Sequence, residues 1–471
     1  VIRLKSKHTI HSLSLRGVEE QQRNGNWNYN GQYKGITGVL SKWDWVHEIE
    51  QDFFKPEQFA DRFNCLMFST DASGLYAFPY GTFIGTVSTT FSYPEWVKGS
   101  GGDNGGNLWA VVHETGHHYQ KLFNLSRCLE SSNNLWSNIA VWKRGASVSR
   151  LDAPQKLFNR FNRHQTWFDM DLGDRTRMYW QLWLYYVELG HKPTFFRDLF
   201  AKFREQPIDS REAKSDYLRF ARFCSEAAGE DLTEFFTFYG FFDKVGNNLP
   251  LKYNDGFYDK VYAPTTISVS QADIDDCKAA MAQYSKKAKN LMFIDERIRK
   301  IQAEGVGSKP GQMRLGTSDD ATPGDAREVG DVGMVTDFRD DLECEAYKVT
   351  DNNGRITVDR NSGKGAVGFK VYDKNGKMVY VSNTYNFTIP SAIVNKGYFV
   401  LCAFGNGKQQ VLSGKENVPA NFLDPAKTLT GINGVKVDAA PTTDKIYDLS
   451  GRPAVNAEHG VRIENGKVVI K

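Results

Sequence analysis

The sequence contains little of what marks membrane proteins or nucleic-acid-binding proteins. None of its apolar runs approaches the ~20 uninterrupted residues that a membrane-spanning helix needs. Lysine and arginine together number 59 and aspartate and glutamate 56, so the net charge is only +3 and no basic stripe is visible. A nucleic-acid-binding protein usually carries a clear basic excess. We therefore expect neither a transmembrane segment nor a nucleic-acid partner.

Cysteine is also scarce, with six residues in 471. These residues lie far apart and form no CxxC pair, which argues against a cysteine-based zinc site and a thioredoxin-type motif, and they are too few for a disulfide scaffold. We interpret them as buried thiols, because free cysteine is among the residue types most often buried. Cys344 and Cys402 share a β-rich region, so a single disulfide between them is an open alternative.

What the chain does have is length and aromatic residues. It is too long for one compact core, and its 13% aromatic and 40% hydrophobic residues indicate a soluble globular protein of more than one domain. The spacing of apolar residues is mixed at first and then becomes helical. A stretch crowded with glycine, proline and aspartate follows, and beyond it apolar residues alternate with polar ones, as in β-strands. We therefore predict an α+β protein. It has a first domain (1–302) with a mixed α/β N-terminal part and a helical C-terminal part, an irregular connector (303–335), and an antiparallel β-sandwich-like domain (336–471) that ends in a β segment (440–471).

The spacing of apolar residues predicts individual elements within these domains. Helical spacing predicts helices over 177–189, 194–203, 210–228 and 232–242. Alternation and β-branched residues predict a strand or hairpin over 82–91 and strands over 355–359, 368–372, 377–381, 398–404 and 461–470. The segment Asp373-Lys374-Asn375-Gly376 predicts a tight turn, since Asn-Gly supplies the positive φ that such turns require.

One short motif is the main candidate for chemistry. The segment 108–120 contains HExxH, formed by His113, Glu114 and His117, and its apolar residues repeat at helical spacing. On a helix, two residues four apart lie on one face, ~6 Å from each other. Both imidazoles then point at one ion, and Glu114, ~100° further round the helix, reaches the open side of that ion. This is the arrangement of a zinc hydrolase with a carboxylate base.

The identity of the third ligand distinguishes between classes of HExxH zinc site. Phe123 stands where a metzincin has its third histidine, which excludes that class. The first acidic residue downstream is Glu130, in a segment (129–140) that has the pattern of a second helix with its apolar residues on the other side. Two histidines and a glutamate with an open fourth position form a catalytic zinc site. We therefore predict one zinc ion per chain, with Glu114 as general base.

Weaker candidates accompany this site. Asn133 and Asn134 lie about one helical turn after Glu130, where they would contact substrate or support the zinc ligands. Tyr179 is a candidate contact for the substrate, and the aromatic stretch 179–186 is a candidate surface for stacking on sugars. For both, packing in the core is the preferred interpretation.

No residue stands out as the donor that would stabilise the oxyanion. Tyr179, Arg177 and His191 lie on or beside a predicted helix, and packing or surface exposure is the preferred interpretation of each. The strand at 84–91 precedes the zinc helix, so by analogy with gluzincins it is a candidate edge strand for an extended substrate.

Several of these stretches together resemble a known family. HETGHHYQ followed by LESSNNLWSN is similar to the pattern of the enhancin-like (M-sixty-like) zinc metallopeptidases, which is HExGHxxQ followed by a glutamate in an E-x-x-x-N-x-x-S-like helix. Two further stretches fit. These are LYAFPYGTFIGT (75–86) and GEDLTEFFTFYGFF (229–242), in which Tyr239 stands where the family usually has tryptophan. The resemblance covers about residues 30–250 and leaves the zinc motif intact.

The resemblance implies a gluzincin-type zinc endopeptidase in which His113, His117 and Glu130 bind zinc and Glu114 is the base. It also implies an enzyme secreted by bacteria or held on their surface that cleaves O-glycosylated host proteins such as mucins. We expect a monomer, with glycans as further ligands of the β-rich domain. The chain begins at Val1 rather than methionine, which we interpret as a missing upstream segment such as a signal peptide. The segment 445–471 resembles the terminal β segment of secreted proteins from gut-type bacteria, which also favours export.

Two alternatives stand beside this interpretation. The first is a zinc peptidase that acts on unglycosylated peptides. The second is a catalytically inactive adhesin that binds glycans or proteins and keeps a vestigial zinc helix. The presence of the complete set His113, Glu114, His117 and Glu130 argues against the adhesin, because decay of an active site usually loses one of its members.

Overall fold

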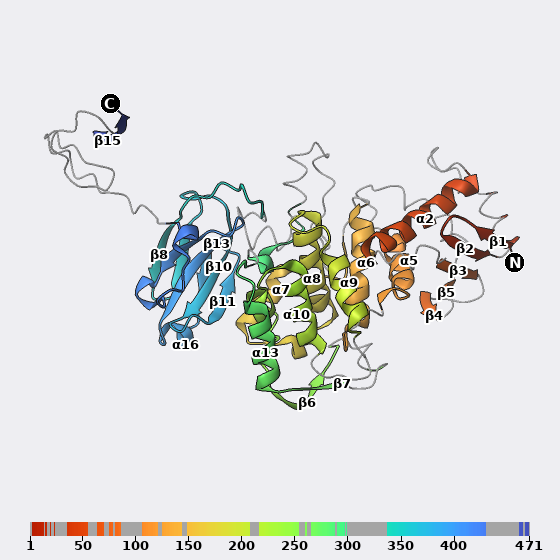
Figure 1. The fold of residues 1–471 in the computed structure, drawn as a ribbon, viewed down its shortest axis with the longest axis horizontal. Coiled ribbons are helices and arrows are strands. Elements are labelled where there is room, and N and C mark those ends of the chain that lie inside the picture. The colour runs from red at the N-terminus through yellow and green to blue at the C-terminus, as the bar shows by residue number, and fades with distance from the viewer. Residues whose placement is uncertain are drawn as a thin grey trace. The chain divides into compact units, whose positions relative to one another are not determined.

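The computed structural model describes most of the chain. The described ranges are 2–13, 35–54, 64–69, 75–78, 81–85, 106–120, 125–143, 148–207, 216–253, 265–287, 290–296, 337–429, 461–464 and 467–470, with a few isolated positions besides. Residues 1–430 form one compact unit and 431–471 another, and each is described by itself. Figure 1 labels the elements along the chain. Within the described ranges, no helix is both long and apolar enough to cross a membrane.

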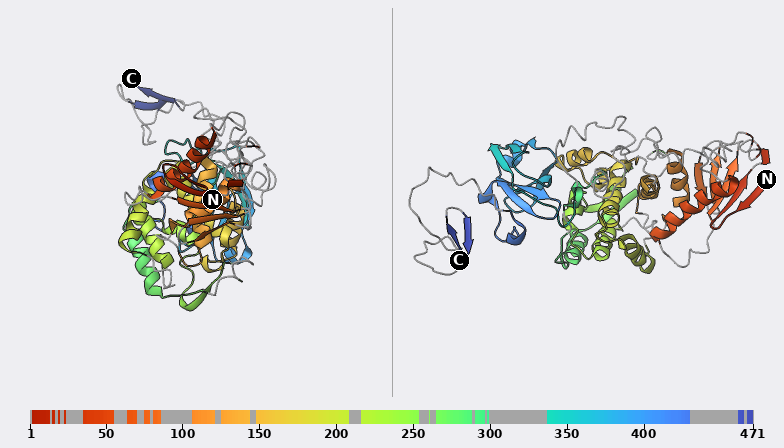
Figure 2. Two further views of the ribbon diagram at one scale, coloured as in Figure 1. Left: turned by 90° about the vertical axis from the view of Figure 1, so that its right-hand side faces the viewer. Right: turned by 90° about the horizontal axis from the view of Figure 1, so that it is seen from above.

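A five-stranded mixed sheet begins the first unit. Its strands are β1 (Ile2–Lys5), β2 (Thr9–Leu13), β3 (Asn64–Ser69), β4 (Leu75–Phe78) and β5 (Gly81–Gly85), in the order β1-β2-β3-β5-β4. Strands β2, β3 and β5 run parallel, whereas β1 and β4 pair antiparallel at the two edges. Helix α2 (Gly35–Phe54) connects β2 to β3, as a parallel pair of strands requires, and packs beside the sheet (Figure 2).

The strand expected over 82–91 corresponds to β5, and residues 86–91 lie outside the described ranges. Strand β5 pairs with β3 on one side and with β4 on the other. Within the described residues this strand is therefore not an edge of the sheet, and β4 holds that position; the rest of the candidate edge strand at 84–91 lies outside the described ranges.

Most of the described residues between 106 and 296 are helical. The helices are α5 (Gly106–Gly116), α6 (Leu129–Lys143), α7 (Pro154–Asn162), α8 (Leu172–Trp183), α9 (Phe195–Glu205), α10 (Asp216–Ala228), α11 (Thr233–Phe238) and α13 (Gln271–Ala282). Between them lie the 3-10 turns η4 (Trp167–Asp169) and η6 (Leu291–Phe293), the π-helical turn η5 (Leu184–Glu188) and the hairpin of β6 (Gly246–Leu251) and β7 (Thr265–Val269). The four predicted helices correspond to α8 with η5, α9, α10 and α11, although residues 210–215 of the third prediction lie outside the described ranges.

Helix α11 is shorter than the helix predicted over 232–242. The chain turns at Gly240, which has a φ of +66°, a conformation that glycine adopts without strain. A Cβ atom at this position would lie 2.6 Å from the Cα atom of Thr166. The close approach of that neighbouring segment explains why the helix ends at Phe238.

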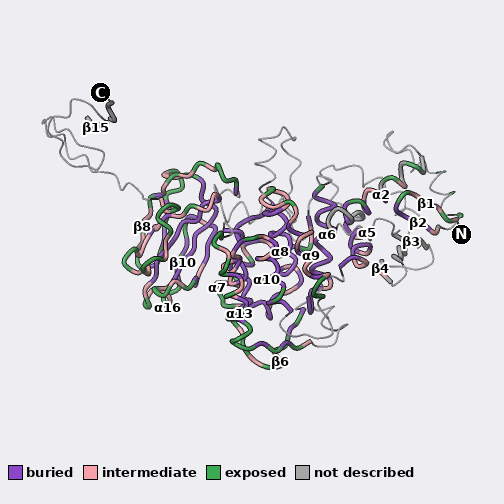
Figure 3. Tube along the Cα trace, viewed as in Figure 1, coloured by how far each residue is buried: buried purple, intermediate pink, exposed green. Residues whose placement is uncertain are grey.

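Aromatic residues form the core of the helical part. In α9 the residues at helical spacing are all buried, namely Phe195, Phe196, Leu199, Phe200 and Phe203. The stretch 179–186 on α8 and η5 is also completely buried, which confirms core packing rather than a surface for sugars. Helix α6 is buried along almost its whole length, including its serine and asparagine residues (Figure 3).

Two antiparallel sheets form the C-terminal part of the first unit, which we call the β-domain (337–429). The order of one sheet is β11 (Met378–Ser382), β10 (Ala366–Asp373), β13 (Tyr398–Phe404) and β14 (Gln409–Ser413), and that of the other is β12 (Asn386–Thr388), β9 (Arg355–Asp359) and β8 (Lys348–Asn352). The short helical elements are α16 (Ser391–Val394), η7 (Lys415–Asn417) and η8 (Pro425–Lys427). Ile356 of one sheet and Phe369 of the other belong to one shared core, so the sandwich-like prediction is confirmed.

Two smaller predictions concern this domain. Gly376 has a φ of +79° and its N–H donates to the carbonyl oxygen of Asp373, which confirms the turn between β10 and β11. Cys344 and Cys402 are free thiols, so no disulfide joins them. The thiol of Cys402 is buried, in line with the interpretation made from the sequence, whereas Cys344 is only half-buried.

Polar contacts join the β-domain to the helices. The side chain of Asn162 in α7 bonds both the N–H and the carbonyl oxygen of Val381 in β11, at 2.9 Å each. The ammonium group of Lys370 lies 2.8 Å from the carboxylate of Glu234 in α11, and the hydroxyl group of Tyr372 donates to the same carboxylate at 2.9 Å. The β-domain is therefore held against the helical part by specific hydrogen bonds.

An apolar contact accompanies these bonds. The ring of Phe293 in η6 lies directly on Gly368 of β10, where a Cβ atom would come within 2.3 Å of the ring. The predicted connector 303–335 lies outside the described ranges. The division into domains at 1–302 and 336–471 is therefore still a proposal.

The described residues of the second unit form one hairpin. Strands β15 (Val461–Glu464) and β16 (Lys467–Ile470) pair antiparallel, so the strand predicted over 461–470 is two strands. Glu464 pairs with Lys467, and residues 465–466 between them lie outside the described ranges.

Candidate metal centre

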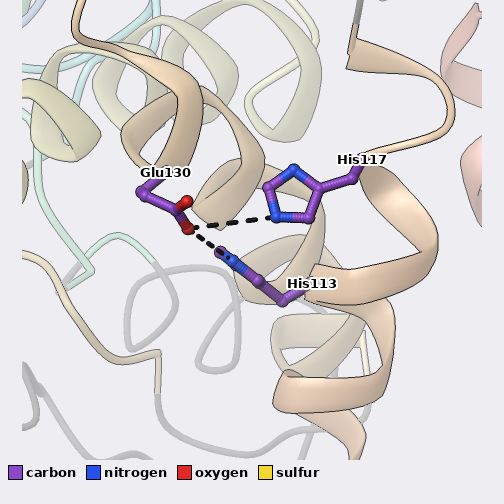
Figure 4. A group of neighbouring side chains, drawn as sticks. All are labelled: His113, His117 and Glu130. Carbon is purple, nitrogen blue, oxygen red and sulfur yellow. Dashed lines mark hydrogen bonds and ion pairs between the residues drawn. The ribbon is translucent and has the colours of Figure 1, made fainter. Parts of the chain in front are cut away.

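Helices α5 and α6 bring three potential ligands together. Oε2 of Glu130, in the first turn of α6, lies 2.9 Å from Nε2 of His113 and 3.9 Å from Nε2 of His117 (Figure 4). All three atoms lie within 4.8 Å of one another, a spacing that suits one metal ion. The three residues that the sequence singled out as ligands are therefore adjacent in the structure.

The helix that carries the motif is shorter than predicted over 108–120. Helix α5 ends at Gly116, and the chain continues as a turn in which the N–H groups of His118 and Tyr119 donate to the carbonyl oxygens of Thr115 and Gly116. His117 lies in this turn rather than in the helix. Its ring still meets that of His113, with the ring centres 4.8 Å apart.

Gln120 orients the ring of His117. The Nε2 group of Gln120 donates to the carbonyl oxygen of Leu129 at 2.5 Å and to the hydroxyl group of Ser132 at 2.9 Å. Its Oε1 atom is therefore the acceptor that faces Nδ1 of His117, so Nδ1 carries the proton and Nε2 keeps its lone pair for a metal. Burial lowers the pKa of His117 to about 4, which keeps the imidazole neutral at neutral pH.

Gly116 allows the two helices to approach closely. A Cβ atom at this position would lie 2.5 Å from both Oδ1 of Asn133 and Cδ1 of Trp136. At the same crossing, Nδ2 of Asn133 donates to the carbonyl oxygen of His113. The glycine of the HETGH segment therefore has a packing role that the spacing of the motif does not reveal.

The structure does not support the weaker substrate-binding candidates. Asn133 and Asn134 are fully buried, and Nδ2 of Asn134 donates to the hydroxyl group of Thr176. Tyr179 is also fully buried, in the aromatic core. Because none of the three side chains reaches solvent, we correct the predicted contacts with substrate. Asn133 instead supports a ligand helix, which was the other alternative for this residue, and Asn134 and Tyr179 pack in the interior.

The other candidates for an oxyanion donor are engaged elsewhere. The guanidinium group of Arg177 is fully buried and pairs with Glu296 at 2.7 Å. The ring of His191 stacks on that of Tyr185, with centres 4.3 Å apart. Of the two preferred interpretations, packing or surface exposure, both residues show packing.

Glu114 lies beside the edge of the mixed sheet. The N–H group of Ala77, in edge strand β4, donates a hydrogen bond to its carboxylate. Burial raises the pKa of this carboxyl group, an effect that the neighbouring His113 opposes. A carboxylate with a raised pKa accepts a proton more readily near neutral pH, as a general base must.

Side chains of helix α2 form hydrogen bonds with residues of the HExxH segment and of the turn after it. The hydroxyl group of Thr115 donates to the buried carboxylate of Glu50 at 2.5 Å. The hydroxyl group of Tyr119 lies 3.1 Å from Nδ1 of His47. Both contacts join α5 and its following turn to a helix far away in the sequence.

Sequence reasoning missed a stacked arrangement on the other side of His113. The indole ring of Trp109 is nearly parallel to the imidazole, with centres 5.0 Å apart, and its Nε1 donates to Oδ1 of Asn138 at 3.0 Å. The guanidinium carbon of Arg150 lies 4.4 Å from the centre of the Trp109 ring. No pattern in the sequence pointed to Asn138 or Arg150, because only the folding of the chain brings them to the motif.

A second group of carboxylates is less suited to a metal. Oxygen atoms of Asp152, Asp171 and Asp174 also lie within 4.8 Å of one another. Lys156 already contacts the first two, at 2.7 and 2.8 Å, and Arg160 pairs with Asp174 at 2.5 Å. These cations compensate the charge that a metal ion would otherwise balance.

The site combines two imidazoles and a carboxylate, which α5, the turn after it and α6 bring together beside a mixed sheet. This arrangement is typical of metal-dependent hydrolases of the HExxH class. The family model of Peptidase M60, enhancin and enhancin-like, matches residues 32–240, and that of the Peptidase M60 C-terminal domain matches residues 346–411. The chain belongs to this family of metallopeptidases, as the resemblance implied. Its fold is an M60 catalytic domain followed by a β-rich C-terminal domain.

Solved structures share this fold. A metallopeptidase from Bacteroides thetaiotaomicron is 24% identical, with a TM-score of 0.69 over 87% of this chain and 65% of its own. A metallopeptidase in complex with Tn antigen is 25% identical, with a TM-score of 0.67 over 87% of this chain and 72% of its own. The chain thus spans less than two thirds of the first of these proteins. No curated protein sequence matches it.

The family implies a metal ion, and the residues present fit one. The three converging atoms are two imidazole nitrogens and a carboxylate oxygen, and the hydrogen bond of His117 to Gln120 leaves Nε2 available. Ligands of this kind suit a divalent transition metal.

Proposed function

We propose that this protein is a zinc-dependent endopeptidase that hydrolyses peptide bonds in O-glycosylated proteins such as mucins. One zinc ion per chain is held by His113, His117 and Glu130, and Glu114 acts as general base. The observation that carries the proposal is the convergence of these three ligand atoms within 4.8 Å beside the half-buried Glu114, in a chain of the M60 family.

The reaction follows from where these groups lie. When bound, zinc supplies Lewis acidity toward the attacking water and the substrate carbonyl group. Glu114 takes a proton from the water as it attacks and passes that proton to the leaving amine. Gln120 keeps His117 in the tautomer that a metal needs, and the bond of Asn133 to the carbonyl oxygen of His113 holds the two ligand helices together.

The choice of glycosylated substrates has separate support. A solved metallopeptidase structure that is 25% identical to this chain is in complex with Tn antigen. We also propose that the enzyme is a monomer, that it is secreted or held on the bacterial surface, and that glycans are ligands of the β-domain. A zinc peptidase for unglycosylated peptides and an inactive adhesin are the alternatives that the experiments below distinguish.

The metal is tested first. Purified protein should hold about one zinc ion per chain by elemental analysis, and His117→Ala should lose it. Glu114→Gln should keep the metal and lose nearly all turnover, because this change removes the base but no ligand. Wild-type turnover in Glu114→Gln would refute the mechanism. A zinc-loaded wild type that cleaves neither glycosylated nor plain peptides would favour the adhesin.

The substrate is tested with matched peptides that differ only in a Ser/Thr-linked sugar beside the scissile bond. Contacts with the sugar would help to position the peptide in the transition state, so removal of the sugar should lower kcat/KM by at least ~10-fold. Fragments are identified by mass spectrometry. Equal cleavage of both peptides would favour the peptidase for unglycosylated substrates.

A further inference from the structure

We propose that Arg150 is a substrate-binding residue that selects for a carboxylate close to the scissile bond, either on an acidic sugar or on an acidic amino-acid side chain. The inference rests on the proposed peptidase function and adds a determinant of its specificity.

Arg150 is linked to the metal centre through two stacked rings. Its guanidinium group lies over one face of Trp109, and the indole ring is stacked nearly parallel to the imidazole of His113. A cation over an indole ring is attracted by the ring quadrupole, which holds the guanidinium group in place. Arg150 therefore occupies a defined position one aromatic ring away from a proposed zinc ligand.

The backbone beside Arg150 is held equally firmly. Asn138, buried in α6, accepts from the N–H of Ser149 at 3.0 Å and donates to the carbonyl oxygen of the same residue at 3.0 Å. The Oδ1 atom of Asn138 also accepts from Nε1 of Trp109. One side chain thus orders both the indole ring and the segment that presents Arg150.

The conformation of Arg150 is itself unusual. Its φ is +54°, in the left-handed region that costs a residue with a side chain ~1 kcal/mol or more. The bonds to Asn138 hold the chain in this conformation. Strain of this kind often occurs where a side chain must be aimed at a ligand.

The charge of Arg150 is available for a ligand. The residue is exposed, and within the described part of the chain no carboxylate forms an ion pair with it.

The shape of the group indicates which ligand it suits. The guanidinium carbon lies 4.4 Å from the centre of the Trp109 ring, a contact that uses none of the hydrogen-bonding capacity of the N–H edge. That edge matches a carboxylate through two parallel bonds. In a glycopeptide, a carboxylate near the scissile bond comes either from an acidic sugar or from aspartate or glutamate.

The test compares four peptides. Two carry a Ser/Thr-linked sugar that is either neutral or carboxylated, and two carry the neutral sugar next to either Asp or Asn. Arg150→Gln should lower kcat/KM by about 10-fold for a carboxylated peptide and leave the neutral peptides within about twofold. The peptide pair that shows the loss identifies the source of the carboxylate. Arg163→Gln, which removes another exposed arginine, is the control and should change neither.

A second measurement does not depend on turnover. In the Glu114→Gln background, calorimetry should show weaker binding of the same carboxylated peptide when Arg150→Gln is added, with zinc content unchanged. Equal losses for neutral and carboxylated peptides, or no loss for either, would overturn the role of Arg150. If the wild type cleaves none of the peptides, the proposed function fails, whereas the binding measurement still decides whether Arg150 recognises a carboxylate.

Discussion

At the scale of single residues, Gln120 has unusual influence because it contacts both halves of the metal centre. It accepts from His117 after α5 and donates to Leu129 and Ser132 at the start of α6. The position of one ligand is therefore coupled to the helix that carries another.

Gln120→Leu should weaken zinc binding by ~10–100-fold, as is typical when the partner of a ligand histidine is lost. The affinity is measured by competition with a chromophoric chelator. Gln120→Glu keeps an acceptor for Nδ1 of His117 and should lose less affinity. If Gln120→Leu binds zinc as tightly as the wild type, the side chain does not orient His117.

A residue-scale prediction about stability concerns His11 in β2. Burial lowers the pKa of His11 to about 3, an effect that the charge of Asp44 opposes, and its Nε2 lies 2.7 Å from the hydroxyl oxygen of Thr9. Below pH ~6.5 the unfolded chain takes up a proton that the folded chain does not. Stability should therefore fall as the pH drops from that value toward 3.

By pH 5.5 this effect should cost the wild type about 1 kcal/mol relative to pH 7.5, and His11→Gln should lack it. Hydrogen exchange of the amides in β1 and β2 reports the local free energy of unfolding. The same pH dependence in the wild type and in His11→Gln would contradict the prediction.

The residues of the proposed zinc site could be predicted from the sequence for a simple reason. His113, Glu114 and His117 lie close together in the chain, and Glu130 is the first acidic residue after them. Arg150 could not be predicted, because its place depends on a bond between Asn138 and the backbone of Ser149. Contacts of that kind leave no periodic signal.

At the scale of elements, the metal centre depends on how closely α5 and α6 cross at Gly116. Gly116→Ala should place a methyl group within contact distance of Asn133 and Trp136 and should destabilise the protein by ~1–3 kcal/mol. Because the helices carry different ligands, zinc affinity should fall as well. Thermal unfolding and chelator competition measure the two effects.

Gly173→Ala is a useful comparison for this prediction. It also introduces a clash, within 2.8 Å of the carboxyl group of Asp152, but in a cluster that carries none of the proposed ligands. It should reduce stability and leave zinc affinity nearly unchanged. Equal losses of zinc affinity in both variants would show that the crossing at Gly116 has no special role.

The spacing of apolar residues predicted where the helices lie, but it did not predict how deeply each helix is buried. The apolar residues of α9 repeat at helical spacing, so the helix was evident. In α6, by contrast, Asn133 and Asn134 suggested a face that contacts substrate, yet all residues from 130 to 142 are buried. Ser131, for example, donates to the carbonyl oxygen of Leu172 at 3.1 Å. Polar residues with partners inside the protein cannot be told from solvated ones by sequence pattern.

At the scale of the whole molecule, the two parts of the first unit should behave as one body. Limited proteolysis is expected to cut first within 303–335, since boundaries favour stretches rich in glycine and proline. The contacts of Asn162 with Val381 and of Lys370 with Glu234 should then keep the two fragments together.

Size-exclusion chromatography of the cut protein should therefore show a single peak that contains both fragments. Asn162→Ala combined with Lys370→Ala should promote their separation, whereas Lys364→Ala, which removes an exposed pair with Glu343, should not. Separation of the wild-type fragments would mean that the β-domain is an independent module. Two domains could be predicted because the spacing of apolar residues changes from helical to alternating along the chain. The hydrogen bonds between the two parts could not be predicted from that spacing.

The contacts between α11 and the β-domain also have a consequence for the evolution of such proteins. Glu234 belongs to the LTEFF segment, which helped to reveal the family, yet its carboxylate bonds Lys370 and Tyr372 of the β-domain. The glutamate of this segment therefore indicates the presence of the β-domain rather than that of the peptidase site. A gene rearrangement that removed the β-domain would relax selection on this glutamate while leaving His113, Glu114 and His117 under constraint.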